Sequence, residues 1–320
     1  MAILSIGFAC FDQFFFLNEW PQENTKNFCH DFIESGGGPA ANAAWLLGLW
    51  GEEVYYIGHL QQDLYGQRII DEFAEAGGET RQGGFSHGLI TPRAPPPGKT
   101  LTGSRTIITR KMQTPPSLTY EQKLKLDDLA ERLIASEEPV TILIDGHEAE
   151  ISEYLIKKLP NARVVMDGGS LRASNIKLAA WTDYFVVSEH FARDYMSYRS
   201  LSTEAEIKAA LIELNKICRG EAFITLGEKG CAFLKSGMLQ IVPSWLCNAV
   251  DTTGAGDVFH GAFTYGVHYS WHIDNIILFA SLTAAISIEK KGVRESMPDL
   301  AVVHHSLNSY ERNLTQYFEE

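Results

Sequence analysis

Cysteines and long apolar runs are both scarce in this sequence. Its five cysteines are scattered over 320 residues, and none stands in a Cys-x-x-Cys pair. This pattern predicts neither a zinc site nor a disulfide framework, and it favours a reducing compartment, the cytoplasm. No run reaches the roughly 20 apolar residues of a transmembrane helix. Asp12 and Asn18 interrupt the apolar residues near the N-terminus, which lack the basic segment of a signal peptide. We therefore expect a cytoplasmic protein with no membrane partner.

Basic residues are also few compared with acidic residues. The chain has 27 Lys and Arg against 40 Asp and Glu, a formal net charge of −13 at pH 7, and no basic stripe is visible. This balance argues against a nucleic-acid partner, although a nucleotide needs only local amides and a metal ion. A hydrophobic content of 45% and a charged content of 21% are typical of a chain with a substantial core. A length of 320 residues would suit two domains of about 150 residues each or one large α/β domain with an appendage, and we expect a single domain over residues 1–320.

Short apolar runs alternate with helix-like stretches along most of the chain. Such alternation predicts an α/β fold with a doubly wound, mostly parallel sheet flanked by helices. Ligands of such sheets gather at the carboxyl ends of the strands. The expected strands cover residues 2–9, 54–58, 140–144, 163–166, 184–187 and 222–226, and the expected helices cover residues 64–76, 121–136, 149–158, 205–218 and 275–289.

Two segments break this alternation with strand-like pieces and no helix. Residues 12–34 contain the run Gln-Phe-Phe-Phe-Leu, and residues 83–118 contain three consecutive prolines and a β-branched run. Ordinary surface loops are one interpretation, but structureless loops of this length are unusual in a compact domain. We therefore expect a small β-sheet lid over the site, whose exposed edge would favour a homodimer.

Residues 251–261, Asp-Thr-Thr-Gly-Ala-Gly-Asp-Val-Phe-His-Gly, are the most informative segment. Gly254, Ala255 and Gly256 precede a helix-like run, so their N–H groups would converge at a helix N-terminus and bind an anion. A carboxylate directly after them, Asp257, would repel a phosphate. The arrangement makes sense if Asp257 removes a proton from a hydroxyl while the amides hold the transferring phosphoryl group. A glycine turn before a dipole-stabilised helix start is the alternative.

A second glycine cluster lies at residues 35–44, Ser-Gly-Gly-Gly-Pro-Ala-Ala-Asn-Ala-Ala, and opens a helix that continues to residue 49. Gly37 and Gly38 would let the backbone approach a ligand, and Asn42 on the first turn would bond a sugar hydroxyl. Asp12 follows the first strand, where its carboxylate could accept two hydroxyl groups of a polyol. A tightly packed helix and a turn-forming aspartate are the alternatives.

Together the two clusters resemble the PfkB (ribokinase-like) family of carbohydrate and nucleoside kinases, with its signatures Gly-Gly-x-x-x-Asn and Asp-Thr-x-Gly-Ala-Gly-Asp. The resemblance extends from Asp12 to Pro298. It implies a ribokinase-like fold and an ATP-dependent kinase in which Mg²⁺ bridges the ATP phosphates. It also implies roles for individual residues: Asp257 as catalytic base, the amides of Gly254, Ala255 and Gly256 as anion hole, and Asp12, Gly37, Gly38 and Asn42 as sugar ligands.

The nucleotide and metal sites follow from this resemblance alone. The loop of Thr225, Gly227 and Gly230 resembles the family's nucleotide-side loop, although a tight hairpin would also explain it. The family's Asn-x-x-Glu pair, which orders the water shell of Mg²⁺, is replaced by Ser188 and Phe191, with Glu189 as a neighbouring substitute. The C-terminal loop resembles one that holds a monovalent cation such as K⁺, with a solvated basic loop as the alternative. Its candidate ligands are Asp251, Thr253, Lys290, Gly292 and Ser296.

The substrate is less defined. Ser188 and residues 142–148 resemble the ketohexokinase-like and sulfosugar-kinase-like branches, which favours a ketose or a modified hexose. If the substrate carries an anionic group, Arg105 in the lid or one of its neighbours Lys99, Arg110 and Lys111 would bind it, with solvated surface residues as the alternative. A nucleoside or vitamin-alcohol kinase of the same fold is one alternative, and a non-catalytic sugar- or nucleotide-binding relative is another.

Overall fold

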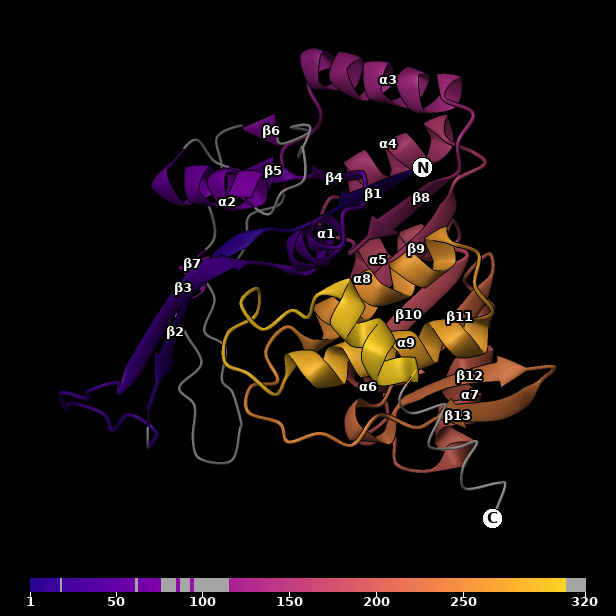
Figure 1. Ribbon diagram of the computed structural model, residues 1–320. Helices are drawn as coiled ribbons and strands as arrows, with labels where there is room; N and C mark the ends of the chain where they lie inside the picture. Colours follow the sequence, from indigo (N-terminus) through magenta and orange to yellow (C-terminus); the bar gives the residue numbers. More distant parts are fainter. Residues whose placement is uncertain (18, 61–62, 76–84, 87–92, 95–114, 309–320) are drawn as a thin grey trace.

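The structure is a computed structural model that describes residues 1–17, 19–60, 63–75, 85–86, 93–94 and 115–308. Its centre is an eight-stranded sheet in the order β13-β12-β11-β10-β9-β8-β1-β4 (Figure 1). The strands from β4 to β11 run parallel, and β12 and β13 are antiparallel at one edge. The strands are β1 Ala2–Ile6, β4 Val54–Ile57, β8 Val140–Ile144, β9 Arg163–Gly168, β10 Tyr184–Ser188, β11 Glu221–Thr225, β12 Cys231–Lys235 and β13 Met238–Val242.

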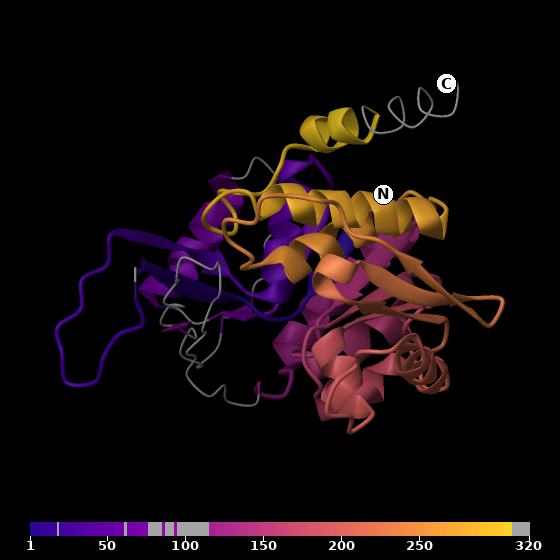
Figure 2. The ribbon, with the colours of Figure 1, turned by 90° about the horizontal axis from the view of Figure 1, so that it is seen from below.

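Helices cover both faces of this sheet and form a separate core on each. Neighbouring residues of β1 show the alternation, since Ile3 packs into one hydrophobic cluster and Leu4 into the other. The first cluster lies under α1 Pro39–Leu49, α2 Leu64–Glu75, α8 Ala255–His268 and α9 Ile273–Ser287, and the second under α3 Tyr120–Ala135, α4 Ala149–Lys158, α5 Ala173–Ala179, α6 Glu189–Tyr195 and α7 Glu204–Asn215. Figure 2 shows α8 and α9 on the side of the sheet opposite the magenta and salmon helices. No helix among the described residues combines the length and the apolarity that crossing a membrane requires.

Side-chain caps set two of the helix starts. Thr119 before α3 and Thr203 before α7 each form a capping box with Gln122 and Glu206, and both helices begin one residue before the predicted position. The prediction missed α5 and α6, which have seven residues each, because so short a helix shows too little periodicity.

A second sheet projects from the first (Figure 1). Its strands are β2 Cys10–Phe16 and β3 Asp31–Gly37, which are antiparallel, with β7 Arg93–Ala94 beside β2. A further pair, β5 His59–Leu60 and β6 Phe85–Ser86, lies nearby. The prediction of a doubly wound, mostly parallel sheet with a small additional β-sheet is confirmed, although the β-branched run at 106–109 lies outside the described residues.

The second glycine cluster differs from its predicted structure. We expected Gly36 and Gly37 in the turn that opens α1, but both belong to β3, where they pair with Phe11 and Cys10. Only Gly38 makes the turn, with a φ of 98°. A Cβ on Gly37 would overlap the carboxylate of Asp12, so the glycine is needed for the close approach of β3 to that side chain.

Candidate active site

The first turn of α8 begins where the sequence predicted it. Gly254 is the N-cap residue in the left-handed region, with a φ of 74°, and a Cβ there would overlap the side chain of Val293. The first N–H groups of a helix have no carbonyl partner within it. The turn therefore places the N–H groups around Gly254 at the positive end of the α8 dipole, where that of Ala255 donates to the Thr252 carbonyl at 3.4 Å.

Asp251 fixes the loop before this turn. Its buried carboxylate accepts hydrogen bonds from the Thr253 hydroxyl at 2.8 Å, the Thr253 N–H at 3.2 Å and the Gly292 N–H at 3.2 Å. The N–H groups of Val250 and Asp251 both donate to the Ile288 carbonyl, at 2.7 and 3.0 Å. These bonds join the loop before α8 to the C-terminal loop that follows α9.

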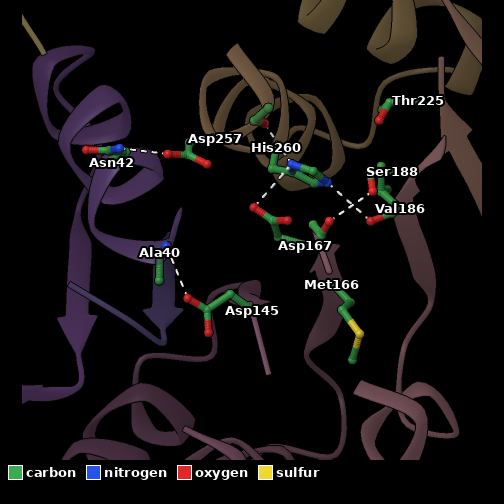
Figure 3. A network of polar contacts seen from close by, with 12 residues as sticks. Ala40, Asn42, Asp145, Met166, Asp167, Val186, Ser188, Thr225, Asp257 and His260 are labelled. Atoms are coloured by element: carbon green, nitrogen blue, oxygen red, sulfur yellow. Dashed lines mark hydrogen bonds and ion pairs between the residues drawn. The ribbon is translucent and has the colours of Figure 1, made fainter. Parts of the chain in front are cut away.

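Asp257 stands in the first turn of α8 and contacts α1. The Asn42 Nδ2 amide donates to the Asp257 Oδ2 atom at 2.7 Å, as Figure 3 shows. We had expected this amide to bond a sugar hydroxyl, whereas in the structure it holds the carboxylate predicted to be the base. The Asn42 Oδ1 atom is buried without a hydrogen-bond partner among the described residues. Asn42 therefore orients Asp257 and keeps one polar atom for another group.

The predicted sugar ligands lie on the projecting sheet and at the start of α1. Asp12 on β2 accepts a hydrogen bond from the Cys10 thiol at 3.2 Å and lies against Gly37 on the neighbouring strand. Burial raises the pKa of Asp12, although the Cys10 hydrogen bond and the charge of Arg294 act in the opposite direction. The structure thus places Asp12, Gly37 and Gly38 on adjacent backbone segments. Arg105 lies outside the described residues.

Two buried carboxylates, Asp145 and Asp167, lie where β8 and β9 end. The sequence analysis predicted no role for Asp167. Asp145 accepts the N–H groups of Phe8 at 2.7 Å, His147 at 2.9 Å and Ala40 at 3.4 Å. Burial alone would raise the pKa of Asp145, but the charge of His147 and these hydrogen bonds lower it.

Asp167 is near a histidine of α8. Its Oδ2 atom lies 3.2 Å from the Nδ1 atom of His260, and both side chains are buried (Figure 3). Sequence reasoning quoted His260 only as part of the α8 segment. The sequence offers one local sign of the Asp167 site: an aspartate near the end of an apolar strand, followed by two glycines. Nothing in the sequence, however, pairs Asp167 with a histidine more than ninety residues later.

The nucleotide-side candidates end β10 and β11 at the same edge of the sheet. The Ser188 hydroxyl caps α6 by accepting the Phe191 N–H at 3.0 Å, and it donates to the Gly169 carbonyl at 2.9 Å. Glu189 is half-buried in the first turn of α6. Thr225 ends β11, and Gly227 and Gly230 flank the turn into β12, so the hairpin interpretation of this loop is confirmed.

Phe191 cannot replace the missing magnesium-side glutamate. Its ring is fully buried and packs edge-on against Phe185, with 5.6 Å between the ring centroids. Ser188 is engaged as a helix cap, and only Glu189 remains as a carboxylate in this segment. No group of three or more His, Cys, Asp or Glu residues suited to a metal occurs in the described part of the chain. These residues offer no ready protein ligand set for Mg²⁺.

The predicted cation ligands are brought together in part. Asp251, Thr253 and Gly292 are joined by hydrogen bonds, and the Ser296 hydroxyl donates to the Gly292 carbonyl at 2.8 Å. Lys290 has an exposed side chain. The Asp251 carboxylate and the Gly292 carbonyl already accept protein donors, and each keeps a further lone pair that a cation could use.

A buried ion pair, which the sequence analysis did not identify, lies behind the glycine strand. The guanidinium of Arg294 is paired with Glu72 and stacks over Trp45 and Phe73, with 4.7 and 5.0 Å to the ring centroids. Glu72 also accepts the Gly36 N–H, at 2.9 Å from its Oε2 atom. The C-terminal loop is thereby tied to β3 as well as to Asp251.

Comparison with known proteins agrees with this geometry. The family described as pfkB family carbohydrate kinase matches residues 167–300. The ribokinase of Lactococcus lactis subsp. lactis is 27% identical over 93% of this chain and 94% of its own length. Fructokinase-2 of Oryza sativa subsp. japonica is 22% identical over 87% and 86%. Among solved structures, a ribokinase from Giardia lamblia has a TM-score of 0.80 at 22% identity, covering 96% of this chain and 98% of that one.

The fold is therefore that of the ribokinases. Residues 167–300 match the pfkB family of carbohydrate kinases, and the ribokinase and fructokinase relatives along most of the chain indicate a phosphotransferase that acts on an alcohol group.

The burial of Phe191 yields a stability prediction. Phe191→Glu, which would recreate the family's glutamate, should lower the free energy of unfolding by at least the roughly 3–5 kcal/mol typical of deleting a buried phenylalanine, because it also buries a carboxylate. Urea denaturation followed by circular dichroism measures the loss. Ser188→Asn is the control, since asparagine also caps helices and should change the stability by less than about 1 kcal/mol. A Phe191→Glu variant as stable as the parent would show that the ring does not belong to the core.

Proposed function

We propose that the protein transfers the γ-phosphoryl group of ATP to a hydroxyl of a small sugar or sugar-derived molecule, with Asp257 as the base. The observation that carries this proposal is the position of Asp257. It lies in the first turn of α8, directly after the Gly254 turn, and is held by Asn42. A carboxylate at a helix N-terminus is stabilised in its ionised form, which is the form that accepts a proton.

The neighbouring amides supply the second requirement of the reaction. Negative charge on the transferring phosphoryl group is stabilised by donors that are fixed before the reaction begins. The backbone N–H groups of Gly254, Ala255 and Gly256 are the proposed donors. A Cβ on Gly256 would meet no atom within 4 Å, so open space lies beside this turn.

Substrate binding divides between the two sheets. Asp12, Gly37 and Gly38 would hold the sugar, with Asn42 acting through Asp257. The projecting sheet would exclude water from the site and so suppress hydrolysis of ATP. ATP would lie along the ends of β10 and β11, beside Ser188, Glu189, Thr225, Gly227 and Gly230.

Mg²⁺ would neutralise the phosphate charges of bound ATP. Because the chain offers few ligands of its own, phosphate and water oxygens would supply most of the coordination. The dependence on Mg²⁺, and on K⁺ at the C-terminal loop, stays a prediction from the family resemblance.

The acceptor is a sugar or a nucleoside, and the relatives span both. Solved structures of similar fold include an Arabidopsis thaliana ribokinase with ribose and ATP, and a Burkholderia thailandensis nucleoside kinase with inosine, with TM-scores of 0.76 and 0.72. A ketose or modified hexose is the favoured substrate on the resemblance of residues 142–148 and Ser188 to the ketohexokinase-like and sulfosugar-kinase-like branches. A panel of sugars and nucleosides with ATP, monitored by ADP release, separates these substrates. It also tests the non-catalytic alternative, which predicts no release with any of them.

Exposed aromatic side chains support a homodimer through the lid. Trp20, Phe28 and Phe32, on or between β2 and β3, are 52%, 78% and 44% exposed. Apolar groups gathered on a protruding sheet favour contact with a second copy.

Replacing the base gives the most direct test. Asp257→Asn should reduce kcat by about 10²-fold or more, because the acceptor hydroxyl keeps its proton. ADP affinity, measured by isothermal titration calorimetry, should change little, since the amide is nearly the same size. Turnover equal to that of the parent would refute the assignment of Asp257 as base.

The open space at Gly256 gives a second test. Gly256→Ala should lower kcat/KM for ATP by about tenfold or more by filling the space where the phosphoryl group would lie. The free energy of unfolding should not fall, because alanine favours a helix over glycine. Gly48→Ala in α1 is the matched control, since its Cβ would lie 3.7 Å from Val54, an ordinary contact. An unchanged kcat/KM in Gly256→Ala would place the phosphoryl group elsewhere.

A further inference from the structure

The ring of His260 is surrounded by oxygen atoms. Its Nδ1 atom lies 2.7 Å from the Gly256 carbonyl oxygen and 3.2 Å from the Asp167 Oδ2 atom, and its Nε2 atom lies 3.2 Å from the Val186 carbonyl oxygen. The side chain is 3% exposed. Figure 3 shows these contacts joining α8 to β9 and β10.

These contacts determine the protons on the ring. A backbone carbonyl accepts hydrogen bonds and cannot donate one. Each ring nitrogen faces such a carbonyl, so a proton on each nitrogen gives both contacts a donor. A neutral imidazole has one nitrogen without a proton, whose lone pair would then face a carbonyl oxygen in the protein interior.

Asp167 supplies the negative charge that a buried imidazolium requires. Burial raises the pKa of Asp167, and the positive charge of His260 counteracts this effect. The charge of Asp145 also raises the pKa of Asp167, and that of His147 lowers it. The group that compensates His260 is therefore a carboxylate within ion-pair distance, on the strand next to β10.

The Gly256 carbonyl connects this charge to the phosphoryl site. It belongs to the same peptide unit as the Asp257 N–H, which lies in the first turn of α8. A hydrogen bond from a cation to a peptide oxygen polarises the unit and strengthens its N–H as a donor. The ring also ties the first turn of α8 to Val186, so that the turn is fixed relative to the strand ends.

We propose that His260 is a positioning residue for phosphoryl transfer, held as an imidazolium by Asp167 and the carbonyls of Gly256 and Val186. It rests on the proposed function, because the turn that it fixes carries the proposed anion hole and base. His260 acts through this turn without contacting the substrate.

Nuclear magnetic resonance tests the charge independently of activity. In ¹⁵N-histidine-labelled protein at about pH 8, where an ordinary histidine with a pKa near 6.5 is neutral, both ring nitrogens of His260 should show imidazolium shifts. His268 is the internal control. It lies in the same helix and is also buried, but burial lowers its pKa to about 4, so its ring should be neutral. The His260→Gln variant assigns the signal by its loss, and a neutral His260 ring would overturn the proposal.

Kinetics test the positioning role. His260→Gln keeps a neutral donor of similar size and should lower kcat by about tenfold or more while the KM for ATP and the affinity for ADP change little. Asp167→Asn should lower kcat in the same way and shift the His260 signals towards the neutral form. His268→Gln should retain the kcat of the parent. The assay uses whichever acceptor of a panel containing ribose, fructose and inosine is phosphorylated.

The outcomes separate this proposal from the proposed function. An imidazolium signal with an unchanged kcat in His260→Gln would refute the positioning role while leaving the assignment of Asp257 intact. Full activity of Asp257→Asn would refute the proposed base, whatever the state of His260. A fall in stability without a change in kcat would assign His260 to the core alone.

Discussion

The hydrogen bonds of Asp145 hold together three segments on which the site depends. Parallel strands all end at one edge of the sheet, and the chain leaving them carries N–H groups that need acceptors once water is excluded. The Asp145 carboxylate accepts from the turn after β1, from the first turn of α1 and from its own loop. The position of α1 in turn sets the position of Asn42, and Asn42 holds Asp257. The geometry of the proposed base thus depends on a carboxylate to which we assign no chemical step.

The carboxylates of the site fall into two groups according to their partners. Glu72 is paired with the cation Arg294, and Asp167 is paired with His260, which we propose to be an imidazolium. Asp12 and Asp257, to which we assign substrate contacts, accept hydrogen bonds from a thiol and an amide, which are neutral donors.

Local patterns were sufficient to predict most of the fold and one part of the site. Buried parallel strands are continuous apolar runs, and a left-handed residue before a helix favours glycine, so the strands and the Gly254 turn could be read from the sequence. The His260–Asp167 and Arg294–Glu72 pairs could not, because each joins residues far apart whose types are common. The partner of Asn42 could not be predicted for the same reason. Its amide can donate to a sugar hydroxyl or to a carboxylate, and only the packing of α1 on α8 brings it to Asp257.

The Asn42–Asp257 contact joins residues 215 positions apart, and the loop that fixes Gly254 through Asp251 and Gly292 lies later still in the chain. A ribosome makes the sugar-side strands first and adds about 5–20 residues each second, so these strands exist for many seconds before the base does. During that interval the growing chain lacks Asp257 and cannot transfer a phosphoryl group by the proposed mechanism, even where the strands that hold the sugar have already formed. Catalysis by the proposed mechanism therefore begins only after these two distant parts of the chain have met.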